Sequence, residues 1–134
     1  MTQQNDYLFV YGTLRQNSNH KMSELLRRYA NFVGNGSYQG KLYQVDYYPG
    51  VVPSDNPQDH VQGEVYQLID ADKLFAQLDE YEECSRHFPR PTEYIRCKQN
   101  VTLTTGEIMS VWIYLFNRAT TGLQLIESGD FYQH

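Results

Sequence analysis

One carboxylate in this sequence occurs where an apolar side chain is expected. The stretch "LFAQLDEYEE", residues 74–83, has the spacing of an amphipathic helix with leucines and an aromatic residue on one face. At about 100° per residue, Glu82 falls within that face, since it follows Leu78 by four positions and Phe75 by seven. The other acids of the run fall toward the polar side: Asp79, Glu80 and Glu83.

A carboxylate surrounded by apolar neighbours can move protons. Desolvation and repulsion from nearby acids raise the pKa of such a group toward neutrality. It can then accept a proton and return it, as general acid/base catalysis requires. The alternative is a helix that has frayed by Glu82, so that the side chain reaches water or pairs with an arginine such as Arg86 or Arg96. Periodicity alone leaves both interpretations open.

A second chemical feature follows the first predicted strand. Strand-forming residues at 7–11 run directly into Gly12 and Thr13, and Leu14 and Arg15 come next. Backbone amides at the end of a strand can hold an anion where a glycine permits close approach. The positive end of a following helix adds to that field, and Arg15 adds charge at the rim. A strand-to-helix turn that needs the glycine for geometry only explains the same pattern.

Hydrophobic periodicity predicts the elements that must position these features. After the strand at 7–11, helical spacing predicts a helix within 16–36, capped by Ser18 or Asn19 and ended by Gly34 or Gly36. The later elements are, in order, a strand at 37–46, a proline-containing loop at 47–60, a strand at 61–69, a helix at 70–83 capped by Asp70 or Asp72, an irregular segment at 84–91, and a hairpin at 93–116 turning at Thr105-Gly106. The tail at 120–134 carries few periodic signals. This order predicts an α+β fold with strands enough for a curled sheet or barrel.

The aromatic residues carry less specific information. Twelve tyrosines can build a cavity that is apolar yet rich in hydrogen-bond donors, although strand packing explains most of them. Trp112 lies between Val111 and Ile113 in a predicted strand, and we expect it in the core.

Composition limits the classes of function. At 134 residues the chain has the length of one domain, 1–134. A formal net charge of −5 does not favour nucleic acid or an anionic membrane as a partner, and no run approaches the roughly 18 apolar residues of a membrane span. Cys84 and Cys97 form neither a CxxC pair nor a disulfide framework, and the N-terminus lacks the pattern of a signal peptide. We therefore expect a cytoplasmic protein; its oligomeric state stays open.

Taken together, the motifs resemble the γ-glutamylcyclotransferase family, in the AIG2-like branch that includes γ-glutamylamine cyclotransferases. The resemblance spans nearly the whole chain in the order of the family. It rests on these segments: "VYGTLR" at 10–15, "SNH" at 18–20, "YPGVV" at 48–52, "VQGEVYQL" at 61–68, "LDEYEE" at 78–83, "YIR" at 94–96, "VWIY" at 111–114 and "ESGDF" at 127–131.

The resemblance implies a fold and a site. The fold is a small mixed β-barrel with two flanking helices and a pocket at the barrel mouth. The catalytic glutamate of the family matches Glu82, the acid that the helical wheel also selects. The loop that holds the substrate matches Tyr11, Gly12, Thr13 and Leu14. Further candidates are Tyr114 as a substrate-binding donor, and Arg15, Asn19 and Pro49 at the pocket rim.

The expected reaction converts a γ-glutamyl amine or amide to 5-oxoproline and releases the amine, with Glu82 as general acid and base. No step requires a metal or an organic cofactor, and the partner is a small γ-glutamyl substrate. The leaving group stays open between an alkylamine, a lysine, an amino acid and a peptide, and the insert at 83–93 lies where it could affect that choice.

Two other classes of function are alternatives. The first is a binding module that retains a γ-glutamyl or other small acidic metabolite without turnover. The second is a glycosidase that pairs Glu82 with Asp79 or Glu80. Helical spacing directs those acids to diverging faces, whereas a glycosidase needs two carboxylates about 5–9.5 Å apart across a cleft.

Overall fold

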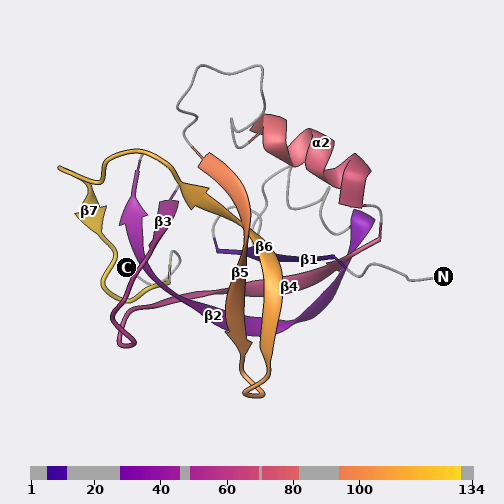
Figure 1. Cartoon of the computed structure of the whole chain (residues 1–134), viewed down its shortest axis with the longest axis horizontal. Helices are drawn as coiled ribbons and strands as arrows, with labels where there is room; N and C mark the ends of the chain where they lie inside the picture. The colour runs from indigo at the N-terminus through magenta and orange to yellow at the C-terminus, as the bar shows by residue number, and fades with distance from the viewer. Residues whose placement is uncertain (1–5, 12–27, 46–48, 70, 82–93, 131–134) are drawn as a thin grey trace.

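The computed structural model describes residues 6–11, 28–45, 49–69, 71–81 and 94–130, with the side chains of 77–81 left out (Figure 1). Its elements are β1 (Tyr7–Val10), β2 (Ala30–Gln44), β3 (Pro49–Pro53), β4 (His60–Leu68), α2 (Ala71–Tyr81), β5 (Tyr94–Leu103), β6 (Ile108–Phe116) and β7 (Gln124–Leu125).

Five of the described strands close on one another. Strand β1 pairs antiparallel with β4 and parallel with β6, β6 pairs with β5, and β2 joins β4 to β5. The resulting ring, β2-β4-β1-β6-β5, is a small mixed barrel. Strands β3 and β7 pair with the C-terminal part of β2, outside the ring. The predicted α+β barrel is thereby confirmed.

Strand β1 is the central element of this barrel, because it is buried on both faces. Leu8, Phe9 and Val10 are each at most 3% exposed. The barrel interior receives side chains from all five strands: Phe9, Tyr11, Tyr38, Val61, Val65, Val101, Val111 and Ile113. A second cluster lies on the outer face and includes side chains of α2: Leu8, Val10, Tyr66, Leu68, Leu74, Phe75, Tyr94, Tyr114 and Phe116. Burial on two sides explains why β1 reads as a continuous apolar run.

Helix α2 covers the outer face of the barrel (Figure 1). Leu74 and Phe75 are 0% and 6% exposed, as the helical wheel predicted for its apolar face. The other predicted flanking helix, within 16–36, falls mostly outside the described residues. Of this range the structure describes 28–36, where residues 28–29 are helical.

The predicted end of the first helix is wrong. The prediction extended it toward Gly34 or Gly36, whereas β2 begins at Ala30 and pairs with β4 from there onward. The register of β2 against β4 shifts between Phe32 and Gly34, so this glycine belongs to a strand irregularity and not to a helix cap. Pairing with β4 therefore overrides the helical spacing of the sequence.

The predicted loop at 47–60 also needs correction. Residues Pro49–Pro53 form β3, which pairs with Gly40–Gln44 of β2. A proline at each end is compatible with this strand because β3 lies at the edge of the sheet, where missing N–H donors cost little. In the tail, Gln124 and Leu125 form the short β7. The hairpin turn is confirmed, with Gly106 at a φ of 93°.

None of the helices in the described part of the chain is long and apolar enough to cross a membrane.

Gly63 of β4 allows a close approach between β4 and β1. A Cβ atom at this position would lie 2.4 Å from the carbonyl oxygen of Val10 and 2.5 Å from the ring of Phe9. We expect Gly63→Ala to lower the free energy of unfolding by about 1–3 kcal/mol, since the backbone of β1 must shift to admit the methyl group. Urea unfolding measures this change.

The matched control is Gly34→Ala, because nothing lies within 4 Å of a Cβ atom at that position. Its free energy of unfolding should change by no more than about 0.5 kcal/mol. Equal effects of the two substitutions would contradict this account of the β1–β4 contact.

Candidate functional site

A row of side chains crosses the outer face of the barrel where β1 ends. Glu64 of β4 pairs with Val10, the last residue of β1. Arg96 of β5 pairs with Tyr114 of β6. Directly paired residues share a face of a sheet, and Val10 and Tyr114 both belong to the outer cluster. The row therefore leads from a carboxylate, past an apolar residue and a phenol, to a guanidinium.

Tyr11 fixes the end of β1 to β6. Its ring belongs to the interior cluster, and its hydroxyl donates a hydrogen bond of 2.5 Å to the carbonyl oxygen of Tyr114. Both residues are buried, at 7% and 3% exposed. The hydroxyl of Tyr11 thus donates its proton to the protein backbone. Its role at the start of the predicted loop is therefore to fix the position of the chain.

Glu64 is a buried carboxylate that the sequence did not single out. Its side chain is 6% exposed, and the Tyr66 hydroxyl donates to its Oε1 atom at 3.0 Å. Tyr66 is 2% exposed, and the ring of Phe32 packs edge-on against it with centroids 5.6 Å apart. In sequence, a glutamate among alternating polar residues of a strand indicates a solvated face. Glu64 is buried because the outer cluster packs over this face of the strand.

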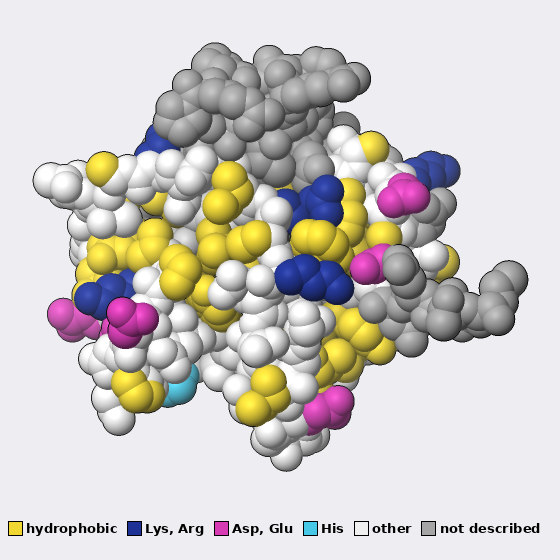
Figure 2. Space-filling model, viewed as in Figure 1, with side chains coloured by type: hydrophobic (Ala, Val, Ile, Leu, Met, Phe, Trp, Pro, Cys, Tyr) yellow, Lys and Arg dark blue, Asp and Glu magenta, His cyan; other side chains and the backbone are white. Residues whose placement is uncertain are grey.

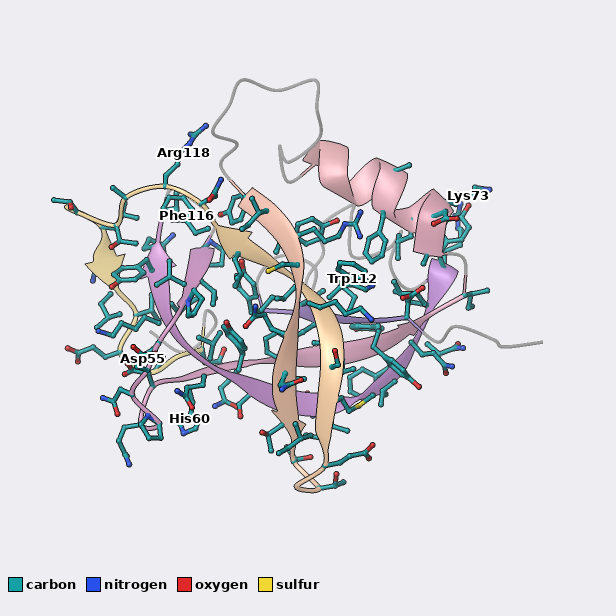
Figure 3. The ribbon with its side chains drawn as sticks, in the orientation of Figure 1. Asp55, His60, Lys73, Trp112, Phe116 and Arg118 are labelled. Atoms are coloured by element: carbon teal, nitrogen blue, oxygen red, sulfur yellow. The ribbon has the colours of Figure 1, made fainter. Side chains whose placement is uncertain are left out.

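Pro49 is joined to the same outer face through β5. The Tyr94 hydroxyl donates to the carbonyl oxygen of Pro49 at 2.6 Å, and the ring of Tyr94 meets Phe116 edge-on at 5.7 Å. The next residue, Gly50, packs so closely that a Cβ atom there would lie 2.9 Å from that of Phe116. Strand β3 thus lies beside the end of β6 (Figure 3).

An open pocket of about 420 Å³ lies near the start of α2. Its lining residues are Asp6, Ala71, Asp72, Phe75, Ala76, Arg96 and Trp112. The Arg96 guanidinium lies 3.9 Å from the ring centroid of Phe75 and 4.8 Å from that of Trp112. Figure 2 shows cationic side chains among apolar ones on this face. These cation–aromatic contacts connect α2 to the barrel.

Trp112 lies at this pocket, partly buried beneath α2 (Figure 3). The prediction of a plain core residue is therefore wrong. Its indole Nε1–H donates to the carboxylate of Asp6 at 3.1 Å, and Lys98 lies 5.1 Å from the ring. An indole N–H group needs a polar partner, which favours a position at the edge of the core.

The predicted site residues divide between described and undescribed segments. Tyr11 and Tyr114 are brought together by a hydrogen bond, and Pro49 is connected to the outer face by Tyr94. The others lie outside the described residues: Gly12, Thr13, Leu14, Arg15, Asn19 and Glu82. Within the described ranges, no group of three or more His, Cys, Asp or Glu side chains could hold a metal ion.

Cys97 and Tyr38 form a polar row inside the barrel. The Tyr38 hydroxyl donates to Gln99 Oε1 at 3.0 Å, and Gln99 Nε2 lies 3.9 Å from Cys97 Sγ. Burial raises the pKa of Tyr38 to about 12. Burial also raises the pKa of the Cys97 thiol, against a smaller opposing effect of the Gln99 hydrogen bond. A thiol kept protonated is a poor nucleophile, so Cys97 is unsuited to covalent catalysis.

Comparisons with known proteins match nearly the whole chain to one family. The profile of the family described as gamma-glutamyl cyclotransferase, AIG2-like, matches residues 8–133. The gamma-glutamylcyclotransferase family protein YtfP of Escherichia coli K12 is 36% identical over 127 residues, covering 92% of this chain and 94% of that protein.

Solved structures show the same fold. YkqA from Bacillus subtilis superposes with a TM-score of 0.73 at 27% identity, covering 98% of this chain and 41% of that one. An AIG2-like protein from Mus musculus superposes with a TM-score of 0.69 at 21% identity, covering 89% of this chain and 82% of that one.

The hydrogen bond from Tyr11 to Tyr114 should stabilise the end of β1. We expect Tyr11→Phe to lower the free energy of unfolding by about 1–3 kcal/mol, because a buried carbonyl oxygen loses its donor. Tyr7→Phe is the control, in the same strand at a half-buried position. If both substitutions have the same effect in urea unfolding, the hydrogen bond does not stabilise this strand end.

The raised thiol pKa predicts slow alkylation of Cys97. In a Cys84→Ser variant, iodoacetamide should label the folded protein several-fold more slowly than the urea-unfolded chain at neutral pH. The rate should rise with pH into the alkaline range, because only the thiolate reacts. Labelling of the folded protein at the unfolded rate would show that the thiol is accessible and its pKa ordinary.

Proposed function

The chain belongs to the AIG2-like γ-glutamyl cyclotransferase family, and on that premise we propose that it cyclises a γ-glutamyl amine or amide to 5-oxoproline and releases the amine. The proposed general acid and base is Glu82. The proposed substrate loop consists of residues 11–14.

One structural observation carries the proposal. Leu8 and Val10 of β1 share a buried cluster with Leu74 and Phe75 of α2. The strand that leads into the 11–14 motif and the helix that leads to Glu82 therefore pack against each other on one face of the barrel. This packing supports a common site for two motifs that lie about 70 residues apart in the sequence.

The proposed loop holds the carboxylate end of the substrate. The α-carboxylate accepts hydrogen bonds from backbone N–H groups of residues 12–14, which a glycine makes accessible. The fixed end of β1, with Tyr11 tied to Tyr114, supplies a rigid base for that loop. Binding to such a base reduces the freedom that the substrate must lose before it reacts.

The proton steps are assigned to Glu82. Its carboxylate takes a proton from the substrate α-ammonium group and so exposes the nitrogen lone pair. The nitrogen attacks the γ-carbonyl carbon of the same molecule, and a C–N bond forms as a five-membered ring closes. Glu82 returns this first proton to the leaving nitrogen as the bond from the γ-carbon to that nitrogen breaks. Glu82 then takes the second proton from the ring nitrogen and passes it to the released amine, which departs as an ammonium ion. The atoms balance without water or any co-reactant.

Holding the reactive conformer is the main contribution expected of the protein. Well-oriented intramolecular reactions gain roughly 7–11 kcal/mol over their bimolecular counterparts. The oxygen of the tetrahedral intermediate also needs a donor. Backbone amides of the loop and the Tyr114 hydroxyl are the two candidates, and Tyr114 lies on the outer face at 3% exposed.

The test is Glu82→Gln, which preserves size and hydrogen bonding but removes the titratable oxygen. We expect kcat to fall by about 10²–10⁴-fold, the usual contribution of general acid/base catalysis. The assay follows 5-oxoproline release from a panel of γ-glutamyl amines, γ-glutamyl-lysine and γ-glutamyl peptides. The panel also identifies the leaving group.

Glu80→Gln is the matched control, since it makes the same chemical change on the side of the helix predicted to be polar. It should retain near wild-type turnover. Full activity of the Glu82 variant would remove this residue from the mechanism. Binding of γ-glutamyl ligands without turnover across the panel would favour the binding module.

A further inference from the structure

The open pocket near the start of α2 has no part in the proposed reaction. Its volume of about 420 Å³ falls within the range of roughly 300–1,000 Å³ that is usual for small-molecule sites. Three of its described lining residues are charged, with Asp6 and Asp72 acidic and Arg96 basic. We propose that this pocket binds a small zwitterion of the ω-amino acid class. The ammonium group of the ligand meets the two aspartates, and its carboxylate meets the arginine.

The strand register separates the opposite charges of this pocket. Strand β1 runs parallel to β6, with Leu8 paired to Trp112. Asp6 lies two residues before Leu8, whereas Arg96 is paired with Tyr114, two residues after Trp112. Along the strand direction, the Cα atoms of Asp6 and Arg96 are therefore about 13 Å apart, at roughly 3.3 Å per residue. Trp112 lies between them.

The path of the chain into α2 brings the two aspartates to the same end of the pocket. Leu68, the last residue of β4, donates its backbone N–H to the carbonyl oxygen of Asp6 at 2.8 Å, and α2 begins three residues later. Asp72 lies in the first turn of that helix. The Arg96 guanidinium instead packs on the ring of Phe75, one turn further along, at 3.9 Å from its centroid. The pocket thus has an acidic end and a basic end.

The charged groups have the capacity to take a ligand in addition to their contacts within the protein. The Trp112 indole donates to Asp6 Oδ1 at 3.1 Å and so orients the carboxylate, whose two oxygens offer about four lone-pair sites. The Asp72 side chain is exposed. Arg96 has a further interaction besides its two ring contacts, and its five N–H donors allow it to bind several acceptors at once. Charge-assisted hydrogen bonds at both ends are about twice as strong as neutral ones.

The lining between the charges favours a ligand with an extended aliphatic stem. The apolar lining consists of Ala71, Phe75, Ala76 and Trp112. Methylene chains lie along such side chains while their charged ends stay hydrated or paired, as the stems of lysine and arginine do. In an α-amino acid a single carbon separates the ammonium group from the carboxylate, which is too short to reach both ends. An ω-amino acid reaches both.

The chain contains a natural reporter for this site. Trp112 is its only tryptophan and lines the pocket, so tryptophan fluorescence follows occupancy. The wild-type protein is titrated with 6-aminohexanoate, with hexanoate, which lacks the ammonium group, and with pentylamine, which lacks the carboxylate. We expect saturable binding of 6-aminohexanoate at millimolar or lower concentration, and binding of the other two at least about tenfold weaker. Isothermal titration calorimetry confirms the affinities.

Two substitutions test the acidic end. Asp6→Asn removes the charge but keeps an oxygen acceptor for the Trp112 indole, and Asp72→Asn removes the charge at an exposed position. Each should weaken 6-aminohexanoate binding about fivefold or more. The matched control is Asp55→Asn, the same change at an exposed position between β3 and β4, far from Trp112 (Figure 3). It should leave the affinity unchanged. If Asp6→Asn does not fold, Asp72→Asn carries the test.

Three results overturn the inference. The first is the absence of saturable 6-aminohexanoate binding up to about 10 mM. The second is binding of hexanoate or pentylamine as tight as that of 6-aminohexanoate, which shows a site for simple anions or for simple amines. The third is an equal effect of Asp72→Asn and Asp55→Asn. The titrations need no turnover, so their outcome is independent of the proposed function.

Discussion

Closure of the barrel around β1 is the constraint on which the rest of the structure depends. This short strand pairs on one side with β4 and on the other with β6, and its side chains are buried toward both the interior and α2. The hydrogen bond from Tyr11 to Tyr114 then fixes the point where the strand ends. A segment held by pairing, packing and a buried hydrogen bond has few alternative positions, which suits it to carry a substrate loop.

The outer face of the barrel holds charged groups in two different ways. Arg96 packs its guanidinium against the rings of Phe75 and Trp112, and these aromatic contacts compensate part of its lost hydration. Glu64 is held by a phenol in a more enclosed position. Arg96 thereby connects α2 to the barrel. Glu64 is buried beside the end of β1 and accepts a hydrogen bond there from Tyr66.

The fold of this family and its chemistry depend on the sequence in different ways. Structures at little more than 20% identity share the arrangement of strands, so the arrangement tolerates wide changes in sequence. Such tolerance is expected where a fold depends on pattern and volume more than on particular side chains. Chemistry depends on particular side chains at particular places, and the described residues bring together the strand and the helix that lead to them.

Local sequence determined the features that depend on short-range rules. The apolar face of α2 followed from helical spacing and is seen in Leu74 and Phe75. The hairpin turn followed from Thr105-Gly106, because a positive φ favours glycine. Glu82 and the 11–14 motif were likewise selected from spacing and resemblance, and all of them except Tyr11 lie outside the described residues.

Tertiary structure alone decided the features that depend on distant neighbours. The start of β2 at Ala30 and the strand at Pro49–Pro53 arise from pairing between segments far apart in the chain, which local periodicity does not encode. The sequence predicts Trp112 in the core and does not single out Glu64. In the structure, Trp112 is partly exposed at the pocket beside α2, and Glu64 is buried on the outer face of the barrel. The burial of a side chain depends on which distant segments pack around it. The sequence pattern therefore identifies these residues but does not predict their surroundings.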